Sequence, residues 1–259
     1  MWPAVTTLLL LVATSACAGF PPADAQTPAA RPTNTGGKYV SGAPRTPVSG
    51  APRTPAPTTS PAPVAGRAAA ALAALPVKGR APKTGYTRDR FGPAWADVDR
   101  DGCDQRNQVL ARDLTAPRFT NARRPCVVLS GTLHSTYTGR TVPFRRGPKT
   151  SDDVQIDHVV ALSDAWQTGA QALDPATRAR LANDPLNLQA VEGPVNQGKG
   201  DSDAATWLPP SNGYRCTYVA RQVAVKTTYR LWVLPAEKEA MARVLATCPG
   251  QPLPASPLR

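Results

Sequence analysis

The apolar residues of the chain follow two spacings. Short runs rich in Val, Leu and Ile are typical of strands, and they alternate with segments in which apolar residues recur every three or four positions, as in amphipathic helices. Strands are expected over residues 126–133, 154–160 and 186–191, and residues 137–144 are expected to form a turn and a returning strand that pairs with the first in an antiparallel hairpin. Helices are expected over residues 101–114, 163–171, 175–182, 216–231 and 236–247, and over 194–207 with a break around residues 198–200. The mixture predicts an α+β domain over residues 85–248.

The region before this domain has a different composition. Residues 19–84 are dominated by Pro, Ala, Thr and Gly, and the octapeptide at 40–47 is repeated without change at 48–55. Such segments bury too little apolar surface to fold alone, so a disordered linker is expected here, with one short helix over residues 68–75. Residues 249–259 are expected to form a flexible tail.

The first 18 residues have the features of a signal peptide. The apolar run is too short to anchor the chain stably in a bilayer, and Ala16 and Ala18 provide the small residues of a cleavage site. A second interpretation remains open, in which Cys17 carries a lipid anchor. In either case we predict a secreted or cell-envelope-associated protein on the extracellular side, with no stable membrane span.

Four cysteines follow Cys17, and an even number in an exported chain favours two disulfides. Three pairings are compatible with the sequence. We favour Cys103–Cys126 with Cys216–Cys248, because each pair would tie one flank of the domain together locally. A four-cysteine zinc site is disfavoured, since no two cysteines have the close spacing of zinc ligands.

The net charge of +12 is unevenly distributed. Residues 1–84 carry 8 Lys and Arg against 1 acidic residue, which gives +7. Residues 85–248 carry 21 Lys and Arg against 17 acidic residues, which gives +4. The predicted domain is therefore only mildly basic, and its charge permits a polyanionic substrate without demanding one.

The residues with the clearest chemistry are Asp157 and His158, at the end of a predicted strand. The chain has only 2 histidines. A neutral imidazole accepts a proton from water near pH 7, and a carboxylate holds a hard divalent cation. Hydrolysis of a phosphodiester needs an activated water and a metal ion, so this pair predicts a metal-dependent nuclease.

Three further segments follow this pair in order. DHVVAL at 157–162 is followed by NLQAV at 187–191, NQGKGD at 196–201 and WLPP at 207–210. The ordered set resembles the HNH (His-Me finger, ββα-metal) endonuclease family, and in particular its secreted bacterial members. The resemblance implies a ββα-metal core with surrounding helices and an antiparallel hairpin.

The resemblance also implies roles for single residues. His158 corresponds to the general base that activates the attacking water, and Asn187 to the asparagine that braces the loop and orients the histidine backbone. Asp157 and Asn196 correspond to metal ligands, and many members have a histidine where this chain has Asn196. An asparagine favours Mg²⁺, with Mn²⁺ or Ca²⁺ as alternatives. Lys199 is expected to contact a phosphate.

An acidic stretch before the first predicted helix also resembles a metal-binding motif. Residues 97–102 match the opening of a calcium loop, D-x-D-x-D-G. Gln108 stands where that loop requires a bidentate glutamate, so an EF-hand is not expected. Helix capping by Asp101 or Asp104 is favoured over a looser calcium site.

Several polar residues outside the motif have structural explanations. Asp201 and Asp203 are expected to cap a helix that leads to Trp207, and His134 is expected to be structural or exposed. Lys226 has two open interpretations, a contact to the nucleic-acid backbone or a charge on a solvated helix face.

The sequence therefore predicts an exported, monomeric endonuclease that hydrolyses nucleic acid, with DNA favoured over RNA. No zinc finger, helix-turn-helix or RNA-recognition module is recognisable, so weakly sequence-specific cleavage is expected. The alternative is a catalytically inactive cell-envelope or nucleic-acid-binding protein that retains the fold.

Overall fold

The computed structural model describes residues 67–258 of the chain. The predicted signal peptide over residues 1–18, the lipid site at Cys17 and the linker up to residue 66 lie outside the described residues. The helices are α1 (Ala68–Ala74), α2 (Gln105–Asp113), α3 (Leu162–Gln167), α4 (Pro175–Asn183), α5 (Gly193–Lys199), α6 (Arg215–Thr228) and α7 (Pro235–Ala246). The strands are β1 (Leu114–Phe119), β2 (Val128–His134), β3 (Thr141–Arg145), β4 (Val154–His158) and β5 (Leu188–Glu192).

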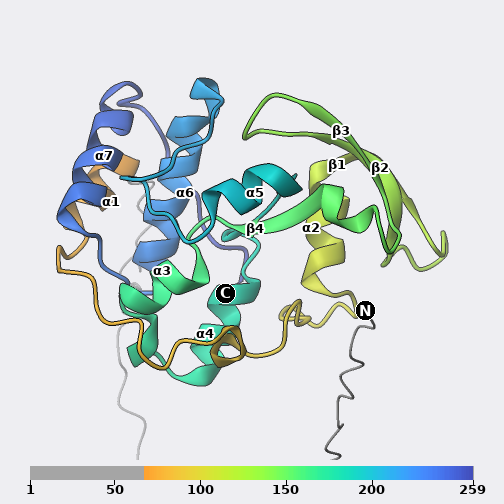
Figure 1. Ribbon diagram of the computed structural model, residues 1–259, viewed down its shortest axis with the longest axis horizontal. Helices are drawn as coiled ribbons and strands as arrows, with labels where there is room; N and C mark the ends of the chain where they lie inside the picture. Colours follow the sequence, from red (N-terminus) through yellow and green to blue (C-terminus); the bar gives the residue numbers. More distant parts are fainter. Residues whose placement is uncertain (1–66, 259) are drawn as a thin grey trace, which may run out of the picture. The chain divides into compact units, whose positions relative to one another are not determined.

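The strands form two small antiparallel sheets, so the predicted α+β class is confirmed (Figure 1). The larger sheet has the order β1-β2-β3, and the predicted hairpin is its β2–β3 pair, with Gly131 opposite Phe144. β1 was not expected from the apolar pattern. Its sequence LTAPRF contains a proline, which a strand accommodates at the edge of a sheet, where β1 lies.

The second sheet pairs β4 with β5, and α5 follows β5 directly. Gly193 joins them, because a Cβ at this position would collide with the carbonyl oxygen of Asp152. Helix α5 contacts both strands. It ends at Lys199, since Gly200 has a left-handed backbone with φ of +54°, which confirms the break expected around residues 198–200.

Three groups of apolar residues form the core. One lies between α2 and the two sheets and includes Leu110, Leu133 and Ile156. A second surrounds α3 and α4, and a third joins α1, α6 and α7. Figure 1 shows β4 and α5 between the three-stranded sheet and the α1, α6 and α7 group. The end of β4 is therefore held by elements on both sides.

Two segments that composition assigns to the linker and the tail are part of this packed core. In α1, Ala68 and Leu72 are buried against α6 and α7. Residues 77–95, here called the strap, are pinned by hydrogen bonds, among them Lys78 N to the Val233 oxygen and Ala81 N to the Gln167 oxygen. At the other end, Gln251 accepts a bond from the amide of Ala68. Apolar contacts and backbone bonds thus fix both segments despite their composition.

The structure confirms both predicted disulfides, Cys103–Cys126 and Cys216–Cys248. The first ties the segment before α2 to the segment before β2, and the second ties the start of α6 to the residues after α7. Asp104 caps α2 as predicted, by accepting a hydrogen bond from the amide of Asn107.

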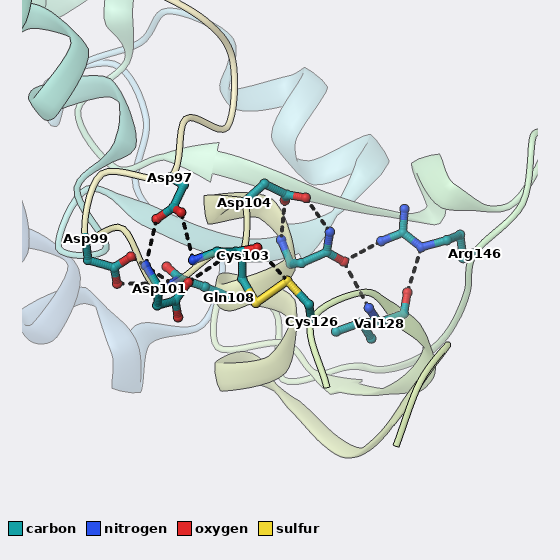
Figure 2. Close-up of a disulfide and its surroundings, with 11 residues drawn as sticks. Asp97, Asp99, Asp101, Cys103, Asp104, Gln108, Cys126, Val128 and Arg146 are labelled. Atoms are coloured by element: carbon teal, nitrogen blue, oxygen red, sulfur yellow. Dashed lines mark hydrogen bonds between the residues drawn. A yellow bond between two sulfur atoms is a disulfide. The ribbon is translucent and has the colours of Figure 1, made fainter. Parts of the chain in front are cut away.

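Figure 2 shows the acidic stretch beside the first disulfide. Asp97 accepts from the amides of Asp101 and Gly102, and Asp99 accepts from the side-chain amide of Gln108. One carboxylate oxygen from each of Asp97, Asp99 and Asp101 lies within 4.8 Å of the other two. The hydrogen bonds of Asp97 and Asp99 fold the loop that leads into α2.

Within residues 67–258, no helix is long and apolar enough to cross a membrane.

Candidate active site

Three of the predicted site residues line one cavity at the end of β4. Asp157 and His158 come from the strand, and Asn196 comes from α5. The cavity has a volume of about 200 Å³, and Arg88 and Asp201 also line it. Residues from the strap, the sheet and the helix after it therefore meet around the imidazole.

His158 is buried and held in one orientation. Its Nε2 lies 2.9 Å from the carbonyl oxygen of Ala182, and because a carbonyl only accepts, this nitrogen carries the hydrogen. Nδ1 is then the nitrogen with the free lone pair. Burial, with the positive charges of Arg88 and Lys199, lowers the pKa of His158 to about 3. The ring is therefore neutral at pH 7.

Asn187 is fully buried and braces the chain that follows His158. Its Oδ1 accepts from the amide of Val160 at 2.8 Å, and its Nδ2 donates to the carbonyl oxygens of Val160 and Leu181 at 3.3 Å. Its own carbonyl accepts from the amide of Val159 at 2.8 Å. These four bonds fix the backbone next to the imidazole.

Asp157 has two buried partners. Oδ1 lies 2.9 Å from the ammonium nitrogen of Lys199, and Oδ2 accepts from the hydroxyl of Tyr137 at 2.7 Å. Lys199 is 1% exposed and also donates to the carbonyl oxygen of His158 at 2.8 Å. Its ammonium thus holds the Asp-His segment from within the protein and is not presented to solvent.

Tyr137 contacts the candidate site, although no sequence pattern had singled it out. Burial raises the pKa of its hydroxyl well above the ordinary value, so it stays a hydrogen-bond donor to Asp157. The turn that carries it is held by Glu192, which accepts from Ser135 and Thr138. Tyr137 lies in a Tyr-Thr-Gly turn sequence, and it has no charge that would single it out among the other aromatic residues.

The chemistry of the donors at the cavity fits a hard divalent cation. Asn196 donates its Nδ2 to Gln155 Oε1 at 2.9 Å, which leaves its amide oxygen without a hydrogen bond in the described part of the chain. With the Asp157 carboxylate this makes an all-oxygen set, as Mg²⁺ prefers. The Lys199 ammonium compensates the charge of Asp157, so such a site would hold a cation weakly without substrate oxygens.

The C-terminal domain of the GmrSD restriction endonucleases matches residues 104–244, more than half of the chain. The chain belongs to this family. An uncharacterized secreted protein of Arthroderma benhamiae is 40% identical over 194 residues, which are 74% of this chain and 90% of that relative. This relative confirms the predicted location outside the cell. No solved structure matches.

Two other charged residues line the cavity: Arg88, which precedes the range that matches the GmrSD family, and Asp201, which ends the NQGKGD motif. Arg88 is in the strap, in the 3₁₀ turn Arg88–Phe91, and is exposed at the cavity. No sequence pattern near Arg88 indicated that it would lie beside His158. Asp201 pairs with Lys83 of the strap at 3.0 Å. Partial burial would raise the pKa of Asp201, but its hydrogen bonds and the Lys83 charge lower it.

Three expectations about other polar residues are corrected or refined. Neither Asp201 nor Asp203 caps a helix, because residues 204–206 form only a turn. Asp203 accepts from the amide of Ala205 and from Arg80. Lys226 is 0% exposed and lies 3.1 Å from Asp164 and 2.9 Å from Glu237, so neither interpretation of it holds. A lysine buried between two carboxylates reaches neither solvent nor nucleic acid. His134 is exposed, as expected.

Proposed function

We propose that this protein is an exported, metal-dependent endonuclease of the HNH type, which hydrolyses phosphodiester bonds in nucleic acid, with DNA as the favoured substrate. The observation that supports this most is the single cavity lined by Asp157, His158 and Asn196. A general base and two oxygen donors beside it are the groups that this hydrolysis requires.

The order of the local elements supports the same reaction class. β4 carries Asp157 and His158, its antiparallel partner β5 begins directly after Asn187, and α5 carries Asn196 and Lys199. This is the strand, strand and helix arrangement expected of a ββα-metal core. The segment between the two strands contains α3 and α4, and Ala182 in α4 supplies the carbonyl that orients the imidazole.

His158 is the proposed general base. With Nε2–H directed to the Ala182 carbonyl, its Nδ1 accepts a proton from the attacking water. Asn187 keeps the backbone after His158 in place, and Lys199 positions Asp157 and the His158 carbonyl. Lys199 is thus proposed as a positioning residue, in place of the phosphate contact expected from the sequence.

Asp157 and Asn196 are the residues that would hold the cation, with Mg²⁺ favoured and Mn²⁺ or Ca²⁺ as alternatives. When bound, the cation supplies electrostatic stabilisation of the phosphate and of the leaving oxygen. Arg88 is exposed on the same cavity, and we assign it to a phosphate oxygen of the substrate. Recognition of this kind concerns the backbone, which agrees with weak sequence specificity.

Plasmid cleavage by the purified, disulfide-bonded protein tests this function. We expect nicking of supercoiled plasmid with Mg²⁺ or Mn²⁺, loss of nicking in EDTA, and recovery when excess Mg²⁺ is added. Absence of cleavage of plasmid, single-stranded DNA and RNA with each of the three ions would refute the enzyme and favour the inactive envelope or nucleic-acid-binding protein.

A further inference from the structure

A second cavity lies beside His158, and the strap forms part of its wall. It has a volume of about 80 Å³, and Phe91, Trp95 and Asn183 are among the residues that line it. Arg88, His158 and Leu162 line both this cavity and the one with Asp157 and Asn196. A group bound in the second cavity would therefore lie next to the reacting phosphate.

The lining of this cavity suits a flat heteroaromatic ring. One water needs roughly 10–15 Å³, so about 80 Å³ leaves room for a ring. Phe91, Pro93 and Leu162 make apolar walls. Asn183, which is 1% exposed, donates its Nδ2 to the Ala179 carbonyl, and its Oδ1 has no hydrogen-bond partner within residues 67–258. This oxygen is free to accept a hydrogen bond from an amino or ring N–H group of a ligand in the cavity.

Trp95 gives the cavity an aromatic wall. Its ring plane is inclined 15° to that of His158, with the ring centroids 6.3 Å apart. Its φ of +61° is an uncommon and strained conformation for a large side chain. The chain thus holds Trp95 in an unfavourable backbone conformation that sets the indole nearly parallel to the proposed general base.

We propose that this cavity binds the nucleobase next to the scissile phosphate, and that the protein therefore cleaves single-stranded nucleic acid in preference to intact duplex. The proposal rests on the proposed endonuclease function. A base that stacks against Trp95 and donates to Asn183 must be unpaired, because a base inside a duplex is stacked and paired and would first have to be flipped out. Trp95 precedes the residues that match the family.

The test compares kcat/KM for a labelled single-stranded oligonucleotide and for the duplex that contains the same strand. We expect the wild type to prefer the single strand. Trp95→Ala should lower kcat/KM on the single strand by roughly 5- to 100-fold, mainly through KM, which is the loss typical of one removed stacking contact. Activity on the duplex should change much less.

Two variants separate recognition from a structural role of Trp95. Trp95→Phe retains an aromatic face and should recover most of the single-strand activity. Trp232→Ala truncates another half-buried tryptophan that also contacts the strap, through its indole N–H and the Gly79 carbonyl. It is not among the lining residues of either cavity and should leave the ratio of the two activities unchanged.

Equal loss on both substrates in Trp95→Ala, no loss, or a duplex preference of the wild type would each overturn the base site. If the wild type cleaves neither substrate, the endonuclease function fails, and binding decides the base site instead. Fluorescence anisotropy of the labelled single strand must then show weaker binding by Trp95→Ala and unchanged binding by Trp232→Ala; unchanged binding by Trp95→Ala would refute the site.

Discussion

Within residues 67–258, two lysines are buried against carboxylates, and they have different surroundings. Lys199 has one carboxylate partner, Asp157, and Asp157 lines the cavity that contains His158. Lys226 has two, Asp164 and Glu237, which come with it from three helices, α3, α6 and α7. The first pair faces the proposed chemistry, whereas the second joins helices in the interior.

The comparison shows that the same ion pair has a different role depending on what else the carboxylate can reach. Burial would lower the pKa of Lys226, but the charges of Asp164 and Glu237 raise it, so this lysine stays charged. Asp157 retains lone pairs beside the cavity after its bonds to Lys199 and Tyr137. We therefore expect changes at Lys226 to affect stability, and changes around Asp157 to affect activity and cation binding.

The largest effect, a loss of activity, is expected on removal of the His158 imidazole. His158→Ala should lower the rate of plasmid nicking by about 10²- to 10⁴-fold, because the proposed general base is lost. His134→Ala, which changes the other histidine on an exposed strand position, is the matched control and should cleave normally. Nicking by His158→Ala at the wild-type rate, with the fold intact by circular dichroism, would remove His158 from the mechanism.

The next effect concerns the stability that Lys226 and its two carboxylate partners give to the fold. Lys226→Met should lower the free energy of unfolding by about 3–5 kcal/mol, since it leaves two buried carboxylates without a cation. Urea unfolding followed by circular dichroism measures this change, and the activity of the molecules that remain folded should be unaltered. A loss below about 1 kcal/mol would show that the cluster is not a structural tie.

The two lysines should differ in their effect on cation binding. The Lys199 ammonium, 2.9 Å from Asp157, repels a cation bound to that carboxylate by several kcal/mol at an effective dielectric constant of about 20. Because Lys199→Met removes this repulsion, it should bind Mn²⁺ at least about tenfold more tightly. Isothermal titration calorimetry or the electron paramagnetic resonance signal of free Mn²⁺ measures this affinity. Lys226→Met is the control. Unchanged Mn²⁺ affinity in Lys199→Met would argue against Asp157 as a ligand.

The smallest effect is a pH dependence of stability, which is expected for the Lys226 cluster and not for the pair of Lys199 and Asp157. The pKa of Lys226 is raised above 10.5, so its contribution to stability is complete below that pH and is lost as pH rises through the folded-state value. Urea midpoints of the wild type should therefore fall more steeply above pH 10.5 than those of Lys226→Met. Parallel midpoints for the two proteins would contradict the assigned charge state.

The local elements were largely predictable from the sequence, because apolar periodicity reports which side of an element is buried. The strand that carries Asp157 and His158 follows from this periodicity. The cap of α2 follows from the position of Asp104, and the two disulfides from the number of cysteines and their places in the chain. β1 and the packed residues 67–84 were not predicted. A proline in β1 and a high alanine and proline content before residue 85 conceal segments whose burial depends on distant partners.

The sequence by itself determined which residues are proposed to carry or support the chemistry, since Asp157, His158, Asn187, Asn196 and Lys199 are distinctive in type and order. Only the tertiary structure decided their partners: Tyr137 and Lys199 on Asp157, Ala182 on His158, and the strap beside them. The physical reason is that a charge or a ring is paired by whichever groups packing brings within a few ångströms. Chain spacing does not encode that proximity for residues in separate elements.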